Sequence, residues 1–290
     1  MQERTRLGCL RRSGEWTRLT DPCSQENVNT FQKNVMDWWA ENKRDLPWRR
    51  DPSPYNVLVS EIMLQQTQVN RVVPKFNEFL AVFPTLESLA NAETKQLLQA
   101  WSGLGYNRRA IWLKETAKQI IERGEFPQTA QDLEKLKGIG PYTSRSILIF
   151  AFNQNLAAVD TNIRRVLIAS GFAEEEMSEK QLQAIADTVL LRGRARDWHN
   201  ALMDYGAQVL TSSSTGISPP SKQTCYEGSS RQVRGAVIRA LTEANELELG
   251  DIMPLLDCDL EESELKSIMS QLMVDGLVEL VRGSSYRIAR

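Results

Sequence analysis

The chain has 290 residues, 41% hydrophobic and 25% charged, which is an ordinary composition for a globular protein of one large or two smaller domains. No apolar run is long enough to span a bilayer, and the first residues lack the apolar core of a secretory signal. We therefore expect a cytoplasmic protein with no membrane partner. The net charge of −2 is unevenly distributed along the chain. Residues 226–290 carry seven basic and twelve acidic side chains, which leaves 28 basic and 25 acidic ones in 1–225. The slight basic excess in 1–225 is compatible with nucleic-acid binding.

Helical patterning dominates the chain up to residue 210. Residues 1–27 are polar and irregular and predict a flexible leader, and apolar residues three or four apart begin at Val28. Almost no segment before residue 278 alternates with period two, so the body, 28–210, is predicted to be all-α. Residues 56–80 predict one helix and then a second one around Pro74. Further helices are predicted over 85–101, 108–123, 130–136, 142–152, 161–170, 179–191 and 195–210.

The last quarter of the chain has a different organisation. Residues 211–230 are rich in Ser, Thr, Gly and Pro, which is typical of a linker. In 231–290, three predicted helices are followed by GLVELVRGSSYRIAR, which reads as a two-stranded hairpin turning at 283–285. Three helices followed by a hairpin predict a small winged-helix-like domain.

Metal chemistry is not indicated. The four cysteines, Cys9, Cys23, Cys225 and Cys258, are scattered without a CxxC pair, whereas a thiolate site needs close spacings. We predict no metal and no iron–sulfur cluster. The single histidine, His199, is interpreted as structural.

A glycine turn between two helices could bind phosphate. In LEKLKGIGPYTSRS, Gly138 and Gly140 flank Ile139, and Pro141 opens the next helix. Glycines let the backbone approach a phosphate, and the helix start offers unpaired N–H groups. A connection between two helices that binds no ligand would have the same pattern, so this turn alone does not show phosphate binding.

Two carboxylates stand out. Asp160, eighteen residues after Tyr142, precedes a helix in VDTNIRRVL, where it caps the helix, carries chemistry, or does both. Backbone donors at a cap are expected to keep it ionised. Glu61 shares one side of an otherwise apolar helix with Val57, Leu64 and Gln65. An apolar surrounding raises the pKa of a carboxyl group, and a general acid at neutral pH needs such a raised pKa. The alternative is that this side of the helix reaches solvent.

Five blocks in order, over about 28–210, resemble the helix-hairpin-helix DNA glycosylases of the MutY-type adenine glycosylase family. They are LPWRR with PY, SEIMLQQTQV, WSGLGYNRRA, the hairpin with VDTNIRRVL, and DWHNALMDYGAQVL. The resemblance implies a two-lobed, all-α fold, a flipped-out base, and a nucleoid-associated enzyme that acts as a monomer on double-stranded DNA containing a mismatch.

The resemblance also implies residue roles. Glu61 would protonate the base, Asp160 would stabilise or attack the sugar, Asn162 would orient both, and Tyr142 would stand at the site. Expected DNA contacts are Gln66, Thr67, Leu104, Tyr106, Gly138, Gly140 and Thr143. Expected base-pocket residues are Trp48, Arg49, Leu64, Val69 and Asp204. Leu64, Val69 and Leu104 could instead belong to the core.

Three features qualify the expected activity. Tyr142 stands where relatives that also cut the strand have a lysine, which forms a Schiff base with the sugar. A tyrosine there implies a glycosylase that leaves the strand uncut. Leu210 stands where the first cluster cysteine is expected. Residues 231–290 are too short for the usual domain that checks for 8-oxoguanine, so the opposite base stays open between guanine and 8-oxoguanine. The alternatives for this domain are a contact with DNA, a contact with a protein, or a packing role. Alternatives are a thymine- or uracil–guanine mismatch glycosylase and a non-catalytic DNA-binding protein.

Overall fold

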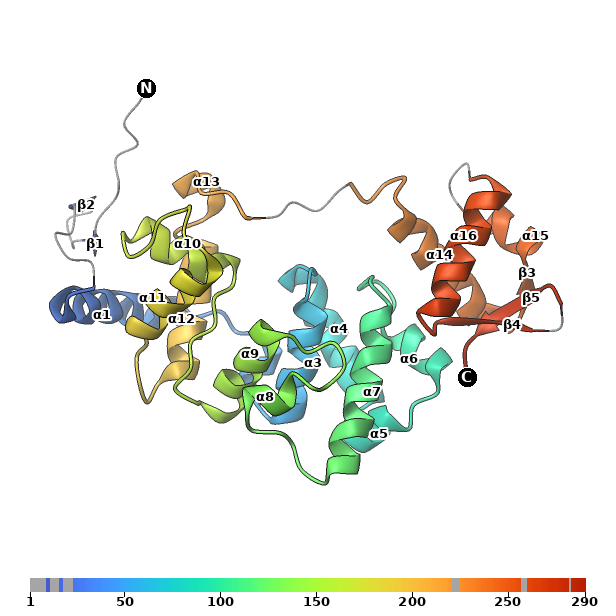
Figure 1. The fold of residues 1–290 in the computed structure, drawn as a ribbon, viewed down its shortest axis with the longest axis horizontal. Helices are drawn as coiled ribbons and strands as arrows, with labels where there is room; N and C mark the ends of the chain where they lie inside the picture. The colour runs from blue at the N-terminus through green and yellow to red at the C-terminus, as the bar shows by residue number, and fades with distance from the viewer. Residues whose placement is uncertain (1–8, 11–15, 18–22, 221–224, 257–259, 282) are drawn as a thin grey trace. The chain divides into compact units, whose positions relative to one another are not determined.

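The computed structural model describes residues 9–10, 16–17, 23–220, 225–256, 260–281 and 283–290 (Figure 1). Most of the predicted leader therefore lies outside the described residues. The chain divides into two compact units, each built from separate stretches. Unit 1 comprises 1–52, 128–130 and 140–222, and unit 2 comprises 53–127, 131–139 and 223–290. No described helix combines the length and apolarity that a bilayer crossing requires.

Unit 1 is helical and packs around aromatic side chains. Phe31 lies 4.7 Å from Phe172 and 5.4 Å from Trp198, between ring centroids, in a continuous apolar core. Its helices are α1 (Gln25–Asn42), α2 (Pro47–Arg50), α9 (Pro141–Phe152), α10 (Thr161–Ala169), α11 (Glu179–Thr188), α12 (Ala195–Gln208) and α13 (Ser212–Thr215). Two two-residue strands, β1 (Cys9–Leu10) and β2 (Trp16–Thr17), pair antiparallel before α1.

The first part of unit 2 is also helical. Phe79, Phe83 and Trp101 pack together and are almost fully buried. The helices are α3 (Pro54–Leu64), α4 (Val69–Val82), α5 (Leu86–Ala90), α6 (Thr94–Ala100), α7 (Arg108–Arg123) and α8 (Ala130–Leu133). The prediction of a single helix over 85–101 is wrong, because residues 91–93 are not helical and separate α5 from α6.

The C-terminal part of unit 2 contains α14 (Ser230–Glu243), α15 (Leu249–Ile252), a 3-10 turn η1 (Met253–Leu255) and α16 (Glu262–Val274). The predicted hairpin is present as β4 (Val278–Val281) and β5 (Ser285–Ile288), with Val281 opposite Ser285. A third strand, β3 (Leu247–Glu248), adds to β5 and completes an antiparallel sheet in the order β3-β5-β4. These two residues were predicted to be helical, and that prediction is wrong. The fold is mainly helical, with this small winged-helix-like end, as predicted.

Candidate active site

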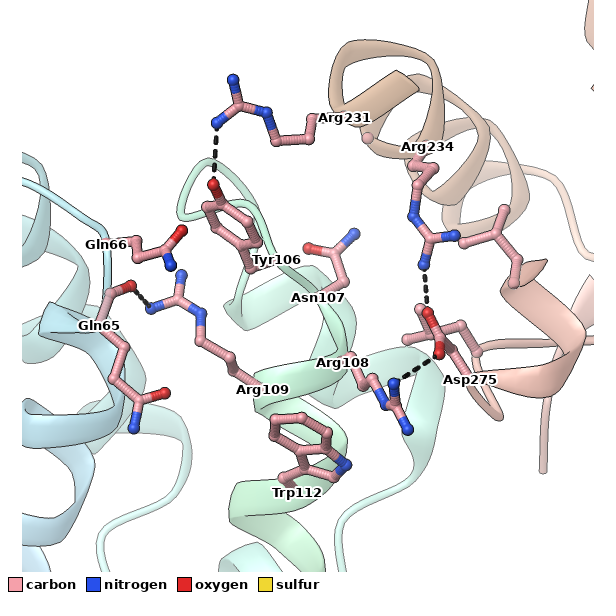
Figure 2. Close-up of a pocket in the computed structure, with 13 residues that line it drawn as sticks. Gln65, Gln66, Tyr106, Asn107, Arg108, Arg109, Trp112, Arg231, Arg234 and Asp275 are labelled. Carbon is pink, nitrogen blue, oxygen red and sulfur yellow. Dashed lines mark hydrogen bonds and ion pairs between the residues drawn. The ribbon is translucent and has the colours of Figure 1, made fainter. Parts of the chain in front are cut away.

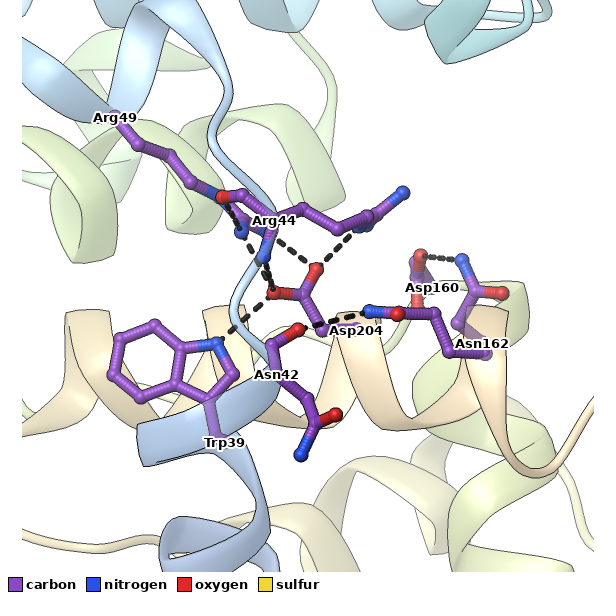
Figure 3. Close-up of polar contacts among 8 residues, drawn as sticks. Trp39, Asn42, Arg44, Arg49, Asp160, Asn162 and Asp204 are labelled. Atoms are coloured by element: carbon purple, nitrogen blue, oxygen red, sulfur yellow. Dashed lines mark hydrogen bonds and ion pairs between the residues drawn. The ribbon is translucent and has the colours of Figure 1, made fainter.

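Asp160 caps the N-terminus of α10 in unit 1 (Figure 3). One carboxylate oxygen accepts a 2.7 Å hydrogen bond from the backbone N–H of Ile163, and the other accepts a 3.0 Å bond from the side-chain amide of Asn162. Burial raises the pKa of Asp160, and these hydrogen bonds lower it without cancelling that effect, so the pKa lies above its ordinary value. The donors expected at this cap are present, but desolvation outweighs their effect on the pKa.

Asn162 is itself held by a buried arginine that the sequence did not single out. An Nη2 of Arg165 donates to the amide oxygen of Asn162 at 2.7 Å and to the backbone carbonyl of Gly206 at 2.7 Å. The Nε of Arg165 donates to the carbonyl of Leu210, just after α12. A Cβ at Gly206 would lie 2.9 Å from the Cβ of Asn162, so only glycine allows this approach of α12 to α10. The donor to Asp160 is thus fixed by the end of α12.

Asp204 lies on α12, fully buried among donors (Figure 3). Arg49 reaches both carboxylate oxygens, at 2.8 and 2.9 Å, and Trp39 Nε1 and the backbone N–H of Arg44 donate at 2.9 and 3.0 Å. Burial would raise the pKa of Asp204, but the hydrogen bonds and charge of Arg49, with the donors of Arg44, hold it below its ordinary value. Two expected base-pocket residues, Arg49 and Asp204, therefore form one ionised cluster.

Arg44 belongs to this cluster, although the sequence analysis did not name it. Its Nε donates to Asp204, and its side chain is more exposed than that of Arg49. The only sequence signal was its place just before the LPWRR block. Trp48, another expected pocket residue, is buried on α2 beside Arg49 in sequence. Guanidinium donors that are held by a buried carboxylate and still partly exposed can bind the acceptor edge of a base.

Glu61 lies in unit 2, on α3, which begins at Pro54 and is capped by the Ser53 side chain. Its neighbours in sequence, Ser60 and Ile62, are buried, whereas Glu61 and Leu64 are partly exposed. Val57, predicted to share their face, is buried. The face is therefore apolar at the start of α3 and opens to the surface near its end, where a carboxyl can meet a ligand.

Arg109 joins the end of α3 to the glycine-rich loop before α7. Its Nη1 donates to the carbonyls of Ile62, Met63 and Gln65 at 2.6 to 2.9 Å. Its Nη2 donates to the hydroxyl of Thr67 and to the carbonyls of Leu104 and Gly105 at 3.0 to 3.2 Å. Both loops that were expected to contact DNA are therefore fixed by one buried guanidinium.

The two loops present different side chains to solvent. Gln66 and Tyr106 have positive φ angles of 55° and 48°, and both are exposed, Tyr106 by 38%. Leu104, also expected to enter the duplex, is only 3% exposed and packs in the core. Leu64 and Val69 are partly exposed and Thr67 is bound by Arg109. Of the two expected wedge residues, Tyr106 is the one placed at the surface.

The glycine hairpin has the geometry that its sequence requires. Gly138 has φ of +77°, and a Cβ there would lie 2.9 Å from the ring of Trp112, so this position needs glycine. Ile139 is buried, and Gly140 precedes α9 as its N-cap. On α9, Thr143 is buried while Tyr142 is 36% exposed. Any ligand contact at Thr143 therefore involves its backbone rather than an exposed hydroxyl.

His199 is a buried structural residue, as the sequence analysis interpreted it. Its Nε2 accepts a hydrogen bond from the backbone N–H of Ala158, and its Nδ1 lies 2.7 Å from the carbonyl of Ala195. An accepting Nε2 places the proton on Nδ1. Burial lowers the pKa of His199 to about 4, so the ring is neutral. The histidine thereby holds the segment that leads into Asp160.

The segment after α12 is ordered by apolar packing and by hydroxyl groups. Leu210 and Ile217 are buried in the core of unit 1, and the Thr211 side chain caps the short helix α13. Within the described part of the chain, no three side chains of the metal-binding types converge. Cys225 is an exposed free thiol. The described residues in this region therefore do not offer the four thiolates that an iron–sulfur cluster needs.

Comparisons with known proteins agree on one family. Residues 59–190 match the HhH-GPD superfamily base excision DNA repair proteins. The chain is 35% identical to an adenine DNA glycosylase of Mycolicibacterium smegmatis over 88% of this chain and 94% of that protein. It is 37% identical to a human adenine DNA glycosylase over 63% of this chain and 36% of that longer protein. A thermostable thymine-DNA glycosylase superposes with a TM-score of 0.60 at 27% identity, covering 66% of this chain and 90% of that one.

Proposed function

The chain belongs to the HhH-GPD superfamily of base excision DNA repair proteins, and we propose from this membership that it is an adenine DNA glycosylase. It would remove adenine mispaired with guanine or 8-oxoguanine from double-stranded DNA. The observation that carries the proposal is the similarity to a bacterial adenine DNA glycosylase over nearly the whole of both chains, with Glu61 and Asp160 both in place. A non-catalytic DNA-binding protein would need neither carboxyl group.

In the proposed reaction, the N-glycosidic bond breaks and its electron pair leaves with adenine, which takes a proton from Glu61. The sugar develops positive charge, which Asp160 stabilises as an anion or captures as a covalent bond. Water then adds to the sugar carbon, displacing the Asp160 carboxylate where it is bound, and gives a proton back to Glu61, which leaves an abasic site. Because burial disfavours the Asp160 anion, a cation formed beside it relieves that cost, so the interaction is stronger in the transition state than before it.

Tyr142 supports a glycosylase without lyase activity. A phenol cannot form the Schiff base through which a lysine cuts the strand. The nearest lysine in sequence, Lys137, precedes the glycine hairpin, and its carbonyl accepts a hydrogen bond from Thr116. We therefore expect the product to be an intact strand with an abasic site.

The cluster of Arg44, Arg49 and Asp204 is the proposed recognition site for the extruded base. The ring nitrogens of adenine accept hydrogen bonds, and the partly exposed guanidinium groups supply donors. Asp204 would act indirectly, because its carboxylate is occupied by Trp39 and both arginines. Trp48, Leu64 and Val69 remain proposed base-pocket residues.

We propose that the protein works without an iron–sulfur cluster or another metal. Its four cysteines stand at 9, 23, 225 and 258, which is not the close spacing of a four-thiolate site. Buried Leu210, at the position where the family resemblance expects the first cysteine, packs in the core instead. The hydrogen bonds from Arg165 would take over the anchoring of this segment.

The proposed partner is DNA with a mismatch, bound by a monomer. Solved structures of endonuclease III–DNA complexes share the fold, with a TM-score of 0.58 for one of them. Gln66, Thr67 and Tyr106 would contact the duplex from one pair of loops, and backbone N–H groups at Gly138, Gly140 and Thr143 would contact phosphate. A cytoplasmic, nucleoid-associated location follows from this partner.

Alkali treatment of reacted duplexes tests the function. Duplexes would carry adenine opposite 8-oxoguanine, adenine opposite guanine, or thymine opposite guanine, with a label on the strand to be attacked. Cleavage of adenine strands after alkali, and not before it, is expected. Glu61→Gln and Asp160→Asn should abolish it, while Glu134→Gln, an exposed residue, should not. Release of thymine alone would favour the mismatch alternative, and full activity of either variant would refute the mechanism.

A further inference from the structure

Unit 2 contains a pocket of about 320 Å³ whose lining comes from two distant parts of the chain (Figure 2). One part is the DNA-contacting region, with Gln66 and Tyr106 and the start of α7. The other is the C-terminal segment, with Arg231 and Arg234 on α14 and Asp275 after α16. The segment that was left open between a DNA and a protein contact therefore lies directly beside a loop proposed to meet DNA.

The charge at this pocket is opposite to that of the C-terminal segment as a whole. Residues 226–290 carry seven basic and twelve acidic side chains. The pocket lining nevertheless contains four arginines, at 108, 109, 231 and 234, and one carboxylate, Asp275. Helix α14 carries three of the seven basic residues and only one acidic residue, Glu243. The acidic segment thus presents its basic helix at this pocket.

Arg231 contacts the exposed wedge residue directly. Its Nη1 donates a 2.8 Å hydrogen bond to the hydroxyl of Tyr106, and its guanidinium lies 5.7 Å from the centre of that ring (Figure 2). Arg109 lies 5.4 Å from the same ring. Guanidinium groups near an exposed aromatic ring are the combination that nucleic-acid surfaces use, with cations for phosphate and rings for bases.

Other contacts hold α14 in this position. Asp275 accepts from Arg234 of α14 at 2.5 Å and from Arg108 of α7 at 3.2 Å, so one carboxylate links the two segments. Farther along, Lys95 of α6 donates to the side chain of Asn245, and Gln99 donates to the carbonyl of Thr242. The placement of Arg231 is therefore supported from both ends of α14.

We propose that Arg231 binds a backbone phosphate of the duplex beside Tyr106, so that the C-terminal segment is a second DNA-contacting element of this protein. This inference rests on the proposed function, in which Tyr106 meets DNA. The contact adds affinity without reading sequence, because a phosphate looks the same at every base pair. Recognition of DNA would thus be shared between the Tyr106 loop and α14.

The salt dependence of binding to an undamaged duplex tests the proposal. Each phosphate contact contributes a slope of about −0.9 to the logarithm of affinity against the logarithm of salt concentration. Arg231→Gln is expected to reduce the slope by about one and to weaken binding about three- to tenfold, equally for matched and mismatched duplexes. Arg231→Lys should keep the slope. Lys266→Gln removes a positive charge from α16, outside the pocket lining, and should change neither quantity.

The outcomes separate this proposal from the function on which it rests. An Arg231→Gln variant that folds with an unchanged melting temperature, yet binds like Lys266→Gln, would overturn the phosphate contact and favour a packing role or a protein partner. Tighter binding by Arg231→Gln would also overturn it, since Arg231 would then be shielding Tyr106. A wild-type protein that binds duplex with the expected slope but releases no adenine would refute the function alone.

Discussion

The side-chain amide of Asn162 donates a 3.0 Å hydrogen bond to the carboxylate of Asp160. A flip of this amide would lose both of its hydrogen bonds, because the amide oxygen accepts a hydrogen bond from Arg165. Arg165 in turn binds the carbonyls of Gly206 and Leu210 at the end of α12. The orientation of the proposed catalytic carboxylate is therefore set from α12 through two side chains.

Replacing Asn162 by alanine should slow excision by up to about 10²-fold, the cost of a misplaced reacting group. The amide also lowers the pKa of Asp160, which must be ionised to act. Its loss should raise that pKa further, so the low-pH fall in the rate of a single turnover should move to higher pH. Rates measured from pH 4.5 to 8 test this. Asn29→Ala, an exposed site on α1, is the control, and an unmoved pH profile would contradict the positioning role.

Replacing Asp160 by asparagine should separate activity from stability. Excision should fall about 10³-fold or more, because the group that faces the developing cation loses its charge. Burial raises the pKa of Asp160 in the folded protein, so the folded state holds its proton more tightly than the unfolded state does. The ionised form then costs stability, and this cost appears as pH rises through the raised pKa.

The Asp160→Asn protein is accordingly expected to melt at a higher temperature than the wild type at pH 7.5. That difference should shrink toward pH 4.5, because the pH then approaches 3.8, the ordinary pKa below which the carboxyl is protonated in both states. Thermal melts at the two pH values provide the measurement. A variant less stable than the wild type at pH 7.5 would mean that the cap to Ile163 outweighs desolvation.

Sequence patterns identified the elements whose signals are local. The VDTNIRR stretch predicted the cap by Asp160, and the turn around Gly138 was predicted from two glycines and a proline. Short strand β3 was missed because its two residues become a strand only by pairing with β5, about forty residues later. The break between α5 and α6 was missed because apolar spacing continues across it.

Three arginines of the candidate site were not predicted from the sequence. Arg109 and Arg165 are almost fully buried and each donates to several groups from distant parts of its unit, and Arg44 binds the distant Asp204. An arginine on a helix ordinarily indicates a solvent-facing position, and nothing in its neighbours reveals buried carbonyls brought to it by folding. Asp204 was predicted as a base-pocket residue, and its hydrogen bonds to Arg44 and Arg49 depend on contacts that the local sequence does not reveal.

Lowering the pH should destabilise unit 1 through His199. The unfolded chain takes up a proton at this histidine near pH 6.5, whereas the folded protein does so only near pH 4. Between these values the unfolded state binds more protons, so stability falls as pH falls. Between pH 7.5 and 5 the loss from this residue is about 2 kcal/mol.

Urea unfolding of wild type and His199→Gln at both pH values isolates this effect, because contributions such as that of Asp160 are common to the two proteins. The variant should be less stable at pH 7.5, since the hydrogen bond to Ala158 is disturbed, and should lose less stability on acidification. Parallel pH dependences in the two proteins would show that His199 does not titrate on unfolding.

Arg109 should be intolerant of lysine. Its two terminal nitrogens meet six oxygen acceptors in the loops at 65–67 and 104–105 and at the end of α3, and an ammonium offers only three donors from one point. Burial lowers the pKa of Arg109 to about 10, so the charge persists at neutral pH and is not what lysine would change. Arg109→Lys leaves buried carbonyls without donors, at an expected cost of about 2–4 kcal/mol in unfolding free energy.

The neighbouring Arg108 provides the control. Arg108→Lys, at a half-exposed ion pair with Asp275, should cost about 1 kcal/mol or less. Urea unfolding gives both values, and amide hydrogen exchange at 65–67 and 104–106 should accelerate in Arg109→Lys alone. Equal, small effects in the two variants would mean that the loops hold their shape without this guanidinium.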